Sequence, residues 1–302
     1  MLKSYARVSN KFDLSLLPEV MSKEPILTLQ RLWAKMRFAK PLSEFAESVP
    51  CFFVLSTGRT GTLTMARLLN LGSEAYVYHE PNVVLFALGK LAYMSANSHK
   101  DILGQAFLTS HWSLFKHSLA CGRGYGETGN CSTFLAPVIS ESLPASRFIH
   151  LVREPQAFVR SAMRRNWYQG AMYDDWRILP RAGTAEAGKW GEWSAFEKNI
   201  WLWQETNRCI REFCDGLGNK RYLRIYSEDF FGGDFEIIRK IFAFLGLTLP
   251  RKRRIEKVMS RKLNKQRKGE FKRPQDWDSG MQEKLLEIAG PEMKRLGYGA
   301  DL

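Results

Sequence analysis

The stretch STGRTGT at residues 56–62 decides the fold of this chain of 302 residues. It follows an apolar run at residues 51–55 that predicts a buried strand, and it precedes a run with helical spacing. Two glycines allow a tight turn, and the N–H groups that open the next helix can face a ligand. Such a strand–loop–helix unit predicts an anion site, formed by Gly58, Arg59, Thr60, Gly61 and Thr62.

This loop differs from the Walker A loop of nucleotide-binding proteins, which has the form GxxxxGK[ST]. Its two glycines are too close together, and no lysine follows the second one. Arg59 lies inside the loop instead. A guanidinium can hold two oxygens of a phosphate and stays charged at any working pH. We therefore expect the loop to bind a phosphate without a required metal ion.

A second anion site is predicted at residues 151–155, LVREP. Arg153 ends an apolar run, Pro155 suits the first turn of a helix, and Ser161 follows eight residues after the arginine. Two such sites predict a ligand with two phosphate groups. Either segment alone is as easily a surface ion pair or an ordinary turn, but their occurrence together in this order favours a functional interpretation.

In these two segments the chain resembles the sulfotransferases, which transfer a sulfuryl group from 3'-phosphoadenosine 5'-phosphosulfate (PAPS) to a hydroxyl or an amine. The loop at residues 56–62 is similar to the family's loop for the 5'-phosphosulfate, and Arg153 with Ser161 keeps the spacing of its 3'-phosphate site. Residues 267–269, RKG, resemble a loop that also contacts the 3'-phosphate in cytosolic members. The resemblance thus implies donor binding by Lys268 and Gly269.

The loop arginine resembles the tyrosylprotein and bacterial carbohydrate or lipid branches more than the cytosolic phenol and steroid branch. Cytosolic members have lysine in the loop and a catalytic histidine after the third strand, where this chain has Arg59 and Gly129. In the other branches a glutamate after the second strand is the base, which implies that role for Glu80. His79 is a rival, because imidazoles ordinarily titrate near neutral pH, and Glu127 is a third candidate.

Strand and helix patterns alternate along the chain and predict an α/β fold. We expect three layers, with a mainly parallel central sheet of about five strands and a P-loop-like phosphate-binding loop. Strands are expected near residues 51–56, 75–79, 125–128, 147–152 and 221–226, and helices near residues 61–71, 102–121, 155–166, 193–214, 235–245 and 282–296. Residues 46–302 are predicted to form this domain. Residues 1–45 are predicted to be a helical segment that packs on it, with an amphipathic stretch at Ile26–Ala39.

Composition favours a globular enzyme of the cytoplasm. With 45% apolar residues the chain can bury a large core. No run reaches the ~18 apolar residues of a membrane-spanning helix, and residues 1–13 are too polar for a signal peptide. The amphipathic stretch allows at most peripheral membrane contact. The five cysteines form neither an even framework nor a C-x-x-C pair, which favours reduced thiols over disulfides or zinc.

The net charge of +14 is concentrated in residues 251–273, which carry twelve lysines and arginines against two glutamates. A nucleic-acid surface would interleave aromatic side chains for stacking, and Phe271 is alone here. We therefore expect no nucleic-acid partner. Attraction of the anionic nucleotide donor, or of an acidic acceptor, explains this charge better.

Six of the nine tryptophans fall between residues 167 and 203. Trp193 and Trp203 recur with helical spacing and suit a core. Five aromatic residues in less regular sequence are candidates for an acceptor wall or lid, and such walls suit sugar rings or lipids: Trp167, Tyr168, Tyr173, Trp176 and Trp190.

The sequence thus predicts a PAPS-dependent sulfotransferase that acts by in-line displacement, needs no metal, and uses a carbohydrate or lipid as the favoured acceptor. A tyrosyl peptide and a small phenol stay open as acceptors. One alternative is a P-loop kinase or another phosphotransferase that uses a nucleoside triphosphate, because residues 222–229 can be read as a strand ending in a metal-binding acid. A second alternative is a non-catalytic basic protein that binds RNA or a membrane surface.

Overall fold

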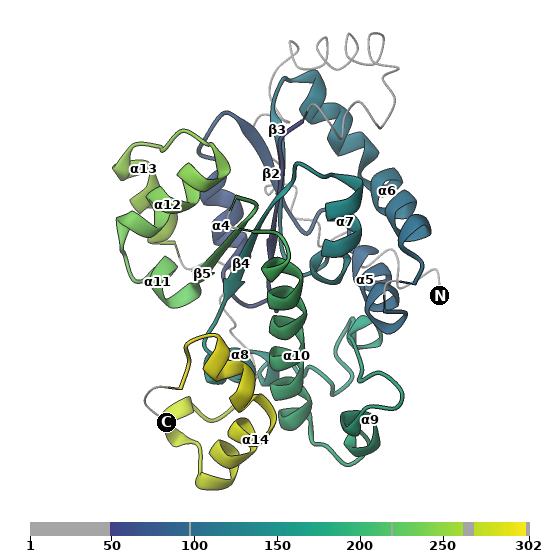
Figure 1. The fold of residues 1–302 in the computed structure, drawn as a ribbon. Helices are drawn as coiled ribbons and strands as arrows, with labels where there is room; N and C mark the ends of the chain where they lie inside the picture. The colour runs from purple at the N-terminus through teal and green to yellow at the C-terminus, as the bar shows by residue number, and fades with distance from the viewer. Residues whose placement is uncertain (1–48, 97, 219, 262–268, 300–302) are drawn as a thin grey trace.

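A five-stranded parallel sheet lies at the centre of the computed structural model, which describes residues 49–96, 98–218, 220–261 and 269–299 (Figure 1). The strand order is β2-β3-β1-β4-β5. The strands are β1 (Cys51–Leu55), β2 (Ala75–His79), β3 (Gly124–Thr128), β4 (Arg147–Val152) and β5 (Tyr222–Tyr226). The predicted N-terminal segment, residues 1–45, and the amphipathic stretch within it lie outside the described residues.

Side chains of the inner strands are buried on both faces of the sheet, as is usual for parallel sheets covered by helices. In β1, Phe53 and Leu55 join one hydrophobic cluster, whereas Phe52 and Val54 join the cluster on the opposite face. The Phe53 ring stacks on Phe148 of β4 at 5.9 Å between centroids. This double burial explains why the strands read as continuous apolar runs in the sequence.

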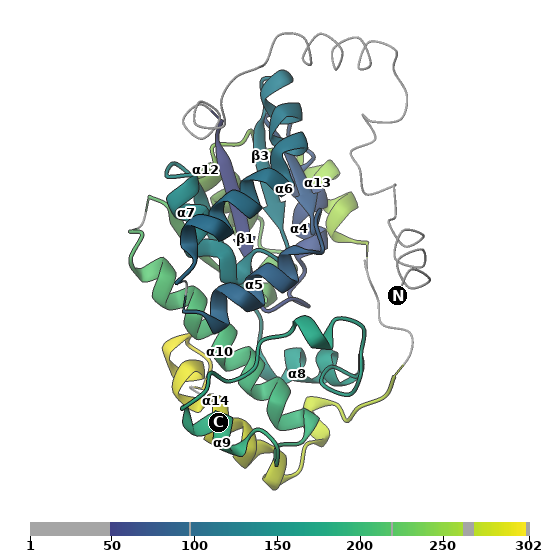
Figure 2. The ribbon, with the colours of Figure 1, turned by 90° about the vertical axis from the view of Figure 1, so that its right-hand side faces the viewer.

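Helices cover both faces of the sheet and complete the three predicted layers (Figures 1 and 2). The cluster around Phe52 contains residues of α4 (Thr62–Leu69), α11 (Ser227–Phe231), α12 (Phe235–Leu245) and α13 (Lys252–Met259). The cluster around Phe53 contains residues of α5 (Leu85–Met94), α6 (Lys100–Ala120) and α7 (Ala136–Ser142), with the carboxyl-terminal part of α10 (Ala195–Asp215). The predicted α/β fold is therefore confirmed.

A third hydrophobic cluster lies beyond the carboxyl ends of the strands, where Figure 1 shows α8, α10 and α14 below the sheet. Its residues come mainly from α8 (Pro155–Met163), α10 and α14 (Ser279–Arg295), and the short α9 (Ala185–Lys189) lies at its rim. Three single 3-10 turns are η3 (Thr133–Leu135), η4 (Asp174–Trp176) and η5 (Pro274–Asp276). A capping box between Ser194 and Glu197 fixes the start of α10.

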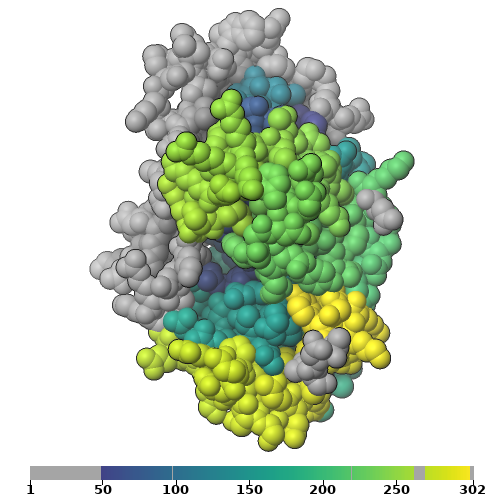
Figure 3. All heavy atoms as spheres, turned by 90° about the vertical axis from the view of Figure 1, so that its left-hand side faces the viewer, coloured from purple at the N-terminus to yellow at the C-terminus, as the bar shows by residue number. Residues whose placement is uncertain are grey.

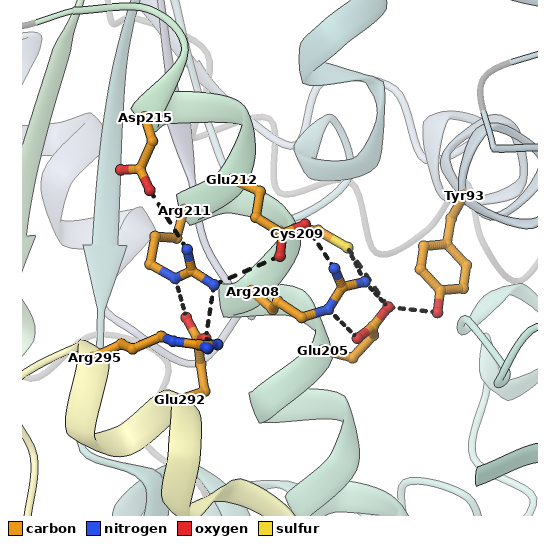
Figure 4. A network of polar contacts seen from close by, with 9 residues as sticks. All are labelled: Tyr93, Glu205, Arg208, Cys209, Arg211, Glu212, Asp215, Glu292 and Arg295. Atoms are coloured by element: carbon orange, nitrogen blue, oxygen red, sulfur yellow. Dashed lines mark hydrogen bonds and ion pairs between the residues drawn. The ribbon is translucent and has the colours of Figure 1, made fainter. Parts of the chain in front are cut away.

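Buried charges tie α10 to its neighbours (Figure 4). Glu292 of α14 is only 1% exposed and receives two hydrogen bonds from Arg211 of α10, at 2.8 and 3.1 Å. On the other side of α10, Glu205 accepts a hydrogen bond of 2.7 Å from the hydroxyl of Tyr93 in α5. Removing Arg211 would leave the buried Glu292 carboxylate with only its longer contact to Arg295, at 3.6 Å. These pairs hold α14 and α5 in fixed positions around α10.

The predicted strands agree with the structure to within one residue, and the six predicted helices are all present. The sequence patterns missed several other helices, among them α5 and α7. α5 has the sequence LFALGKLAYM, which is apolar almost throughout and shows no 3.6-residue period. Within the described residues, no helix combines the length and the apolar character needed to cross a bilayer.

Candidate active site

The topology of the sheet opens a crevice at the carboxyl ends of β1 and β4. From β1 the chain continues through α4 to β2 on one side, whereas from β4 it continues through α8 and α10 to β5 on the other side. The loops after these adjacent strands therefore diverge. Open parallel sheets bind ligands at such a switch point, and both predicted anion-binding segments lie here.

The loop at residues 56–62 has the features of an anion cradle. Gly61 has φ of 101° and directly precedes α4, whose first turn has no side-chain cap. The N–H groups at the start of α4 therefore point toward the crevice. The Thr60 hydroxyl is buried, and no atom of the described residues accepts or donates a hydrogen bond to it. A buried polar atom without a partner indicates a site for a ligand or a water molecule.

Two side chains bring the predicted anion sites together. The Nη1 group of Arg153 donates a hydrogen bond of 2.5 Å to the carbonyl oxygen of Arg59. The Nε group of Arg59 donates in turn to the Ser161 hydroxyl at 3.2 Å. Arg59 therefore bridges the loop after β1 and the first turns of α8. The two segments lie side by side, close enough for one nucleotide to contact both.

Positive charge accumulates around this bridge. Burial, reinforced by the charges of Arg165 and Arg153, lowers the pKa of Arg59 to about 10. Burial also lowers the pKa values of Arg153 and Arg165. All three side chains stay protonated at neutral pH, in an environment that disfavours their charge. An anion placed among them would relieve this penalty.

A cavity of about 1210 Å³ extends from these arginines. Figure 3 shows the hollow between the yellow-green atoms of the α11–α13 region and the teal atoms below them. Its wall comes from every segment that follows a strand of the sheet: residues 58–64, 79–86, 130, 153–177 and 227–231, together with 259–261. Five residues of the anion-binding loop line this cavity: Gly58, Arg59, Thr60, Gly61 and Thr62.

His79 and Glu80 line the same cavity at the end of β2. The Nε2 atom of His79 lies 4.0 Å from Oε2 of Glu80, and the two side chains are 15% and 31% exposed. Glu80 has a positive φ of 47° although it is not glycine. Such strained backbone is uncommon and is concentrated at functional sites.

Gly129 explains how Glu80 reaches this position. A Cβ atom on Gly129 would lie 2.4 Å from Cγ of Glu80, and φ of Gly129 is 149°. The carboxylate of Glu80 thus occupies the space that a side chain at position 129 would fill. Cytosolic sulfotransferases have their catalytic histidine at the position that corresponds to Gly129. The glutamate and a side chain at residue 129 exclude each other in this geometry.

Glu127, the third candidate base, lies in the core and not in the cavity. Its side chain is 1% exposed, and Oε2 lies 3.1 Å from Nε2 of His111 on α6. The Tyr125 hydroxyl donates a further hydrogen bond of 2.8 Å to it. Burial lowers the pKa of His111, but its contact with Glu127 outweighs burial and leaves the pKa raised. The proposal of Glu127 as a base is therefore wrong, because its strand position turns the carboxylate toward α6.

Two of the five aromatic residues proposed for an acceptor wall line the cavity, namely Trp167 and Tyr173. The other three pack elsewhere. The Tyr168 hydroxyl donates to the carbonyl of Ile178, and the Trp190 ring packs on Trp201. Trp176 lines a separate small pocket of about 30 Å³. The sequence placed these rings near one another but could not indicate which way they face.

The predicted RKG loop is described only in part. Lys268 lies outside the described residues. Gly269 does not line the cavity; its carbonyl accepts a hydrogen bond of 2.9 Å from Nε of Arg164, three residues beyond Ser161 on the same segment. A role for these two residues at the 3'-phosphate stays a prediction.

Sequence reasoning missed several residues of the cavity wall. Asn130 follows β3 at its carboxyl end, so the rule that selected Glu80 could also have selected it. Other missed residues lie in helices or irregular segments that are adjacent only in the folded chain, among them Phe86, Arg165, Met172, Arg177, Phe231, Met259 and Arg261.

A comparison with solved structures found several sulfotransferases. A sulfotransferase domain from the curacin biosynthetic pathway superposes with a TM-score of 0.50 and 15% identity, covering 83% of this chain and 98% of that chain. A sulfotransferase from Alicyclobacillus acidocaldarius gives a TM-score of 0.49 and 15% identity, covering 82% of this chain and 94% of that one. A sulfotransferase domain from the olefin synthase of Synechococcus PCC 7002 gives 0.48 and 18%, covering 83% and 95%.

At such identities the structural likeness shows the fold alone. A comparison with curated proteins returned no match. The sequence profile of the sulfotransferase family, in contrast, matches residues 50–251, which include the loop at residues 56–62, His79, Glu80 and the Arg153–Ser161 segment. This match covers most of the chain, and it agrees with the parallel sheet and the anion-binding crevice. The chain belongs to the sulfotransferase family.

Proposed function

We propose that this PAPS-dependent sulfotransferase binds its donor across Arg59, Arg153 and Ser161 and transfers the sulfuryl group to a hydroxyl of a carbohydrate or a lipid. One observation carries the donor site: Arg59 contacts both Arg153 and Ser161, so that two predicted anion-binding segments form one wall of the cavity. The 3'-phosphate is assigned to Arg153 and Ser161, and the 5'-phosphosulfate to the loop at residues 58–62.

The residues present fit a nucleotide with two anionic groups, a 3'-phosphate and a 5'-phosphosulfate. The Thr60 hydroxyl lacks a partner among the described residues, and the first turn of α4 offers N–H groups that no side chain caps. When bound, PAPS supplies a sulfuryl group joined to a phosphate leaving group. This group carries less charge than a γ-phosphoryl group, so the arginines can stabilise it without a divalent metal ion.

In the proposed reaction the chain contributes position and charge. Arg59 stabilises the charge that develops on the sulfuryl group and the bridging oxygen. In comparable sites one such group lowers the activation free energy by ~3 kcal/mol. Glu80 accepts the proton of the acceptor hydroxyl as the general base. The support for this role is its exposure in the cavity, its strained backbone and its place over Gly129.

The acceptor side of the cavity is apolar with a few polar groups. Phe86, Trp167, Met172 and Tyr173 line it, and the rings of Phe86 and Tyr173 stack at 6.0 Å between centroids. The guanidinium of Arg177 lies over the Trp167 ring at 3.7 Å. Pockets of this kind suit ligands that combine apolar surface with hydroxyl groups, which favours a glycoside or a lipid over a strongly charged acceptor.

Replacing Tyr173 with alanine is expected to raise the KM for octyl glucoside, a probe with sugar hydroxyls and an alkyl chain, by roughly tenfold. The loss follows from the removed aromatic surface. Tyr173→Phe keeps the ring and serves as the matched control, with an unchanged KM. Steady-state kinetics at saturating PAPS checks both. Equal KM values in Tyr173→Ala and the wild type would remove Tyr173 from the acceptor site.

Titration calorimetry with adenosine 3',5'-bisphosphate and with ATP tests the donor assignment. The bisphosphate is expected to bind at least ~100-fold more tightly, because the 3'-phosphate uses charge-assisted hydrogen bonds that ATP cannot make. EDTA should leave this affinity unchanged. Preference for ATP with a requirement for Mg²⁺ would contradict the assignment and favour a phosphotransferase.

A further inference from the structure

We propose that His79 receives the proton that Glu80 removes from the acceptor, and that Thr128 is the positioning residue that holds the His79 ring and the backbone of Glu80 for this relay. The inference rests on the sulfuryl-transfer function proposed above. In this inference His79 is not a rival base; it accepts the proton from Glu80 in a second step. Thr128, at the end of β3, has no role in the sequence analysis.

The carbonyl oxygen of Thr128 contacts both residues of the proposed relay. It accepts a hydrogen bond from the backbone N–H of Glu80 at 3.0 Å. It also lies 3.0 Å from Nδ1 of the His79 ring. A carbonyl oxygen has two lone pairs, so these two contacts use its full capacity. One backbone atom thus orients both His79 and Glu80.

The hydroxyl of Thr128 is the second neighbour of Nδ1 and favours the same tautomer as the carbonyl oxygen. This hydroxyl donates its hydrogen to the carbonyl oxygen of Thr62, at 3.0 Å. It can therefore only accept at its other contact, with Nδ1 of His79 at 3.3 Å. Both neighbours of Nδ1 are then acceptors, so Nδ1 carries the hydrogen. In the neutral ring, Nε2 is left with a free lone pair.

This lone pair faces the carboxylate of Glu80. Nε2 lies 4.0 Å from Oε2, while Oε1 accepts a hydrogen bond of 3.4 Å from the N–H of Asn130. This separation is longer than a hydrogen bond, so a proton can pass between the two atoms only after the carboxylate moves closer. Rotation of the glutamate can shorten the gap to the ~2.9 Å of a hydrogen bond, and catalytic contacts often close only in the substrate complex.

The balanced step has two proton transfers. As the acceptor oxygen bonds to sulfur, the bond from sulfur to the 5'-phosphate oxygen breaks, and its electron pair leaves with the phosphate. The acceptor proton moves to the carboxylate of Glu80 and then from Oε2 to Nε2 of His79. Glu80 returns to a carboxylate, and the imidazolium keeps its Nδ1–H bond to Thr128. The ring later releases the proton to water.

Two ionisable groups of the described residues interact with Glu80 from neighbouring segments. Arg59 approaches Glu80 from the loop after β1, and its pKa is influenced by the glutamate charge. The thiol of Cys131, beyond β3, also lies within the influence of Glu80, and burial raises its pKa so that it stays neutral. The Thr62 carbonyl that receives the Thr128 hydroxyl belongs to the anion-binding loop. Donor loop, base and relay therefore share one rigid frame.

Turnover of PAPS with octyl glucoside as the acceptor, and hydrolysis of PAPS with water as the acceptor, test the relay. His79→Asn keeps an N–H group for Thr128 but has no basic nitrogen, so kcat is expected to fall roughly 10–100-fold with an unchanged KM for PAPS. His79→Ala should lose a similar factor and recover part of it in added imidazole. A wild-type kcat in His79→Asn, or no recovery in His79→Ala, overturns the relay.

Thr128 gives an independent pair of variants. Thr128→Val keeps the carbonyl but removes the hydroxyl that joins the His79 ring to the Thr62 carbonyl of the anion-binding loop, so kcat should fall several-fold, whereas Thr128→Ser should keep the wild-type kcat. A fall in kcat without recovery in the serine variant would show that only packing matters at residue 128 and would contradict the positioning role.

Nitrogen NMR of protein with ¹⁵N-labelled histidine reads the tautomer without any substrate. The pair of ring-nitrogen resonances that is absent in His79→Asn belongs to His79. Their chemical shifts are expected to indicate a protonated Nδ1 and an unprotonated Nε2. Hydrogen on Nε2 in the neutral ring overturns the inference. If the wild-type protein does not bind the donor, the proposed function is refuted, but the tautomer of His79 is unaffected. A failure of the proposed function can therefore be distinguished from a failure of the relay.

Discussion

Replacing Glu80 with glutamine is expected to lower kcat by about 10²–10⁴-fold, the usual contribution of a general base. The amide has nearly the same shape but cannot accept the acceptor proton. Its hydrogen bond from Asn130 can be kept, because the amide oxygen still accepts. We therefore expect the structure around residue 80 to be preserved and the Kd for adenosine 3',5'-bisphosphate to be unchanged.

The measurement combines turnover of PAPS with octyl glucoside and calorimetry with the bisphosphate. Glu141→Gln is the matched control, since it makes the same change on α7, where Glu141 forms an exposed ion pair with Lys100 of α6 and does not line the cavity. This control should keep the wild-type kcat. Wild-type turnover in Glu80→Gln would move the role of base to His79 and would remove the first step of the relay.

Replacing Arg153 with alanine is expected to weaken binding of adenosine 3',5'-bisphosphate by about 10–100-fold or more. The variant loses charge-assisted hydrogen bonds to the 3'-phosphate, each worth ~1.5–3 kcal/mol. It also loses the contact from Nη1 to the carbonyl of Arg59, which holds the anion-binding loop against α8. Both effects act on the donor, so its Kd should change more than any property of the acceptor.

Calorimetry on three variants separates these effects. Arg153→Lys keeps the charge but loses the planar fork, so we expect an intermediate Kd. Arg147→Ala is the control at the opposite end of the same strand, where Nη1 donates to the carbonyl of Phe244. It should leave the Kd unchanged. Unaltered affinity in Arg153→Ala would refute the assignment of the 3'-phosphate site.

The fold was largely predictable because its signals are local. Each strand of a covered parallel sheet is a short apolar run, and β2 and β4 were predicted with their observed bounds. Long amphipathic helices such as α10 also show a clear period. α5 was missed because nearly every residue is apolar, so that its period is hidden.

Several site residues were selected by their place at or after the carboxyl end of a predicted strand, and their roles stay predictions. Arg59, Glu80 and Arg153 were selected by this rule, and all three line the cavity. Glu127 was selected by the same rule but lies within β3, where alternation directs its carboxylate toward His111. Position along the strand is visible in the sequence, whereas the chemistry of the facing layer is not.

By itself, the sequence determined a parallel α/β fold with two anion-binding segments, because glycines, hydroxyls and arginines after apolar runs depend only on neighbours along the chain. Only the tertiary structure decided that Arg59 bridges to Ser161, that Glu80 lies over Gly129, and that the Thr128 carbonyl contacts both the Glu80 N–H and the His79 ring. Those contacts join residues far apart in the chain. Their distances follow from strand order and helix packing, which no local pattern encodes.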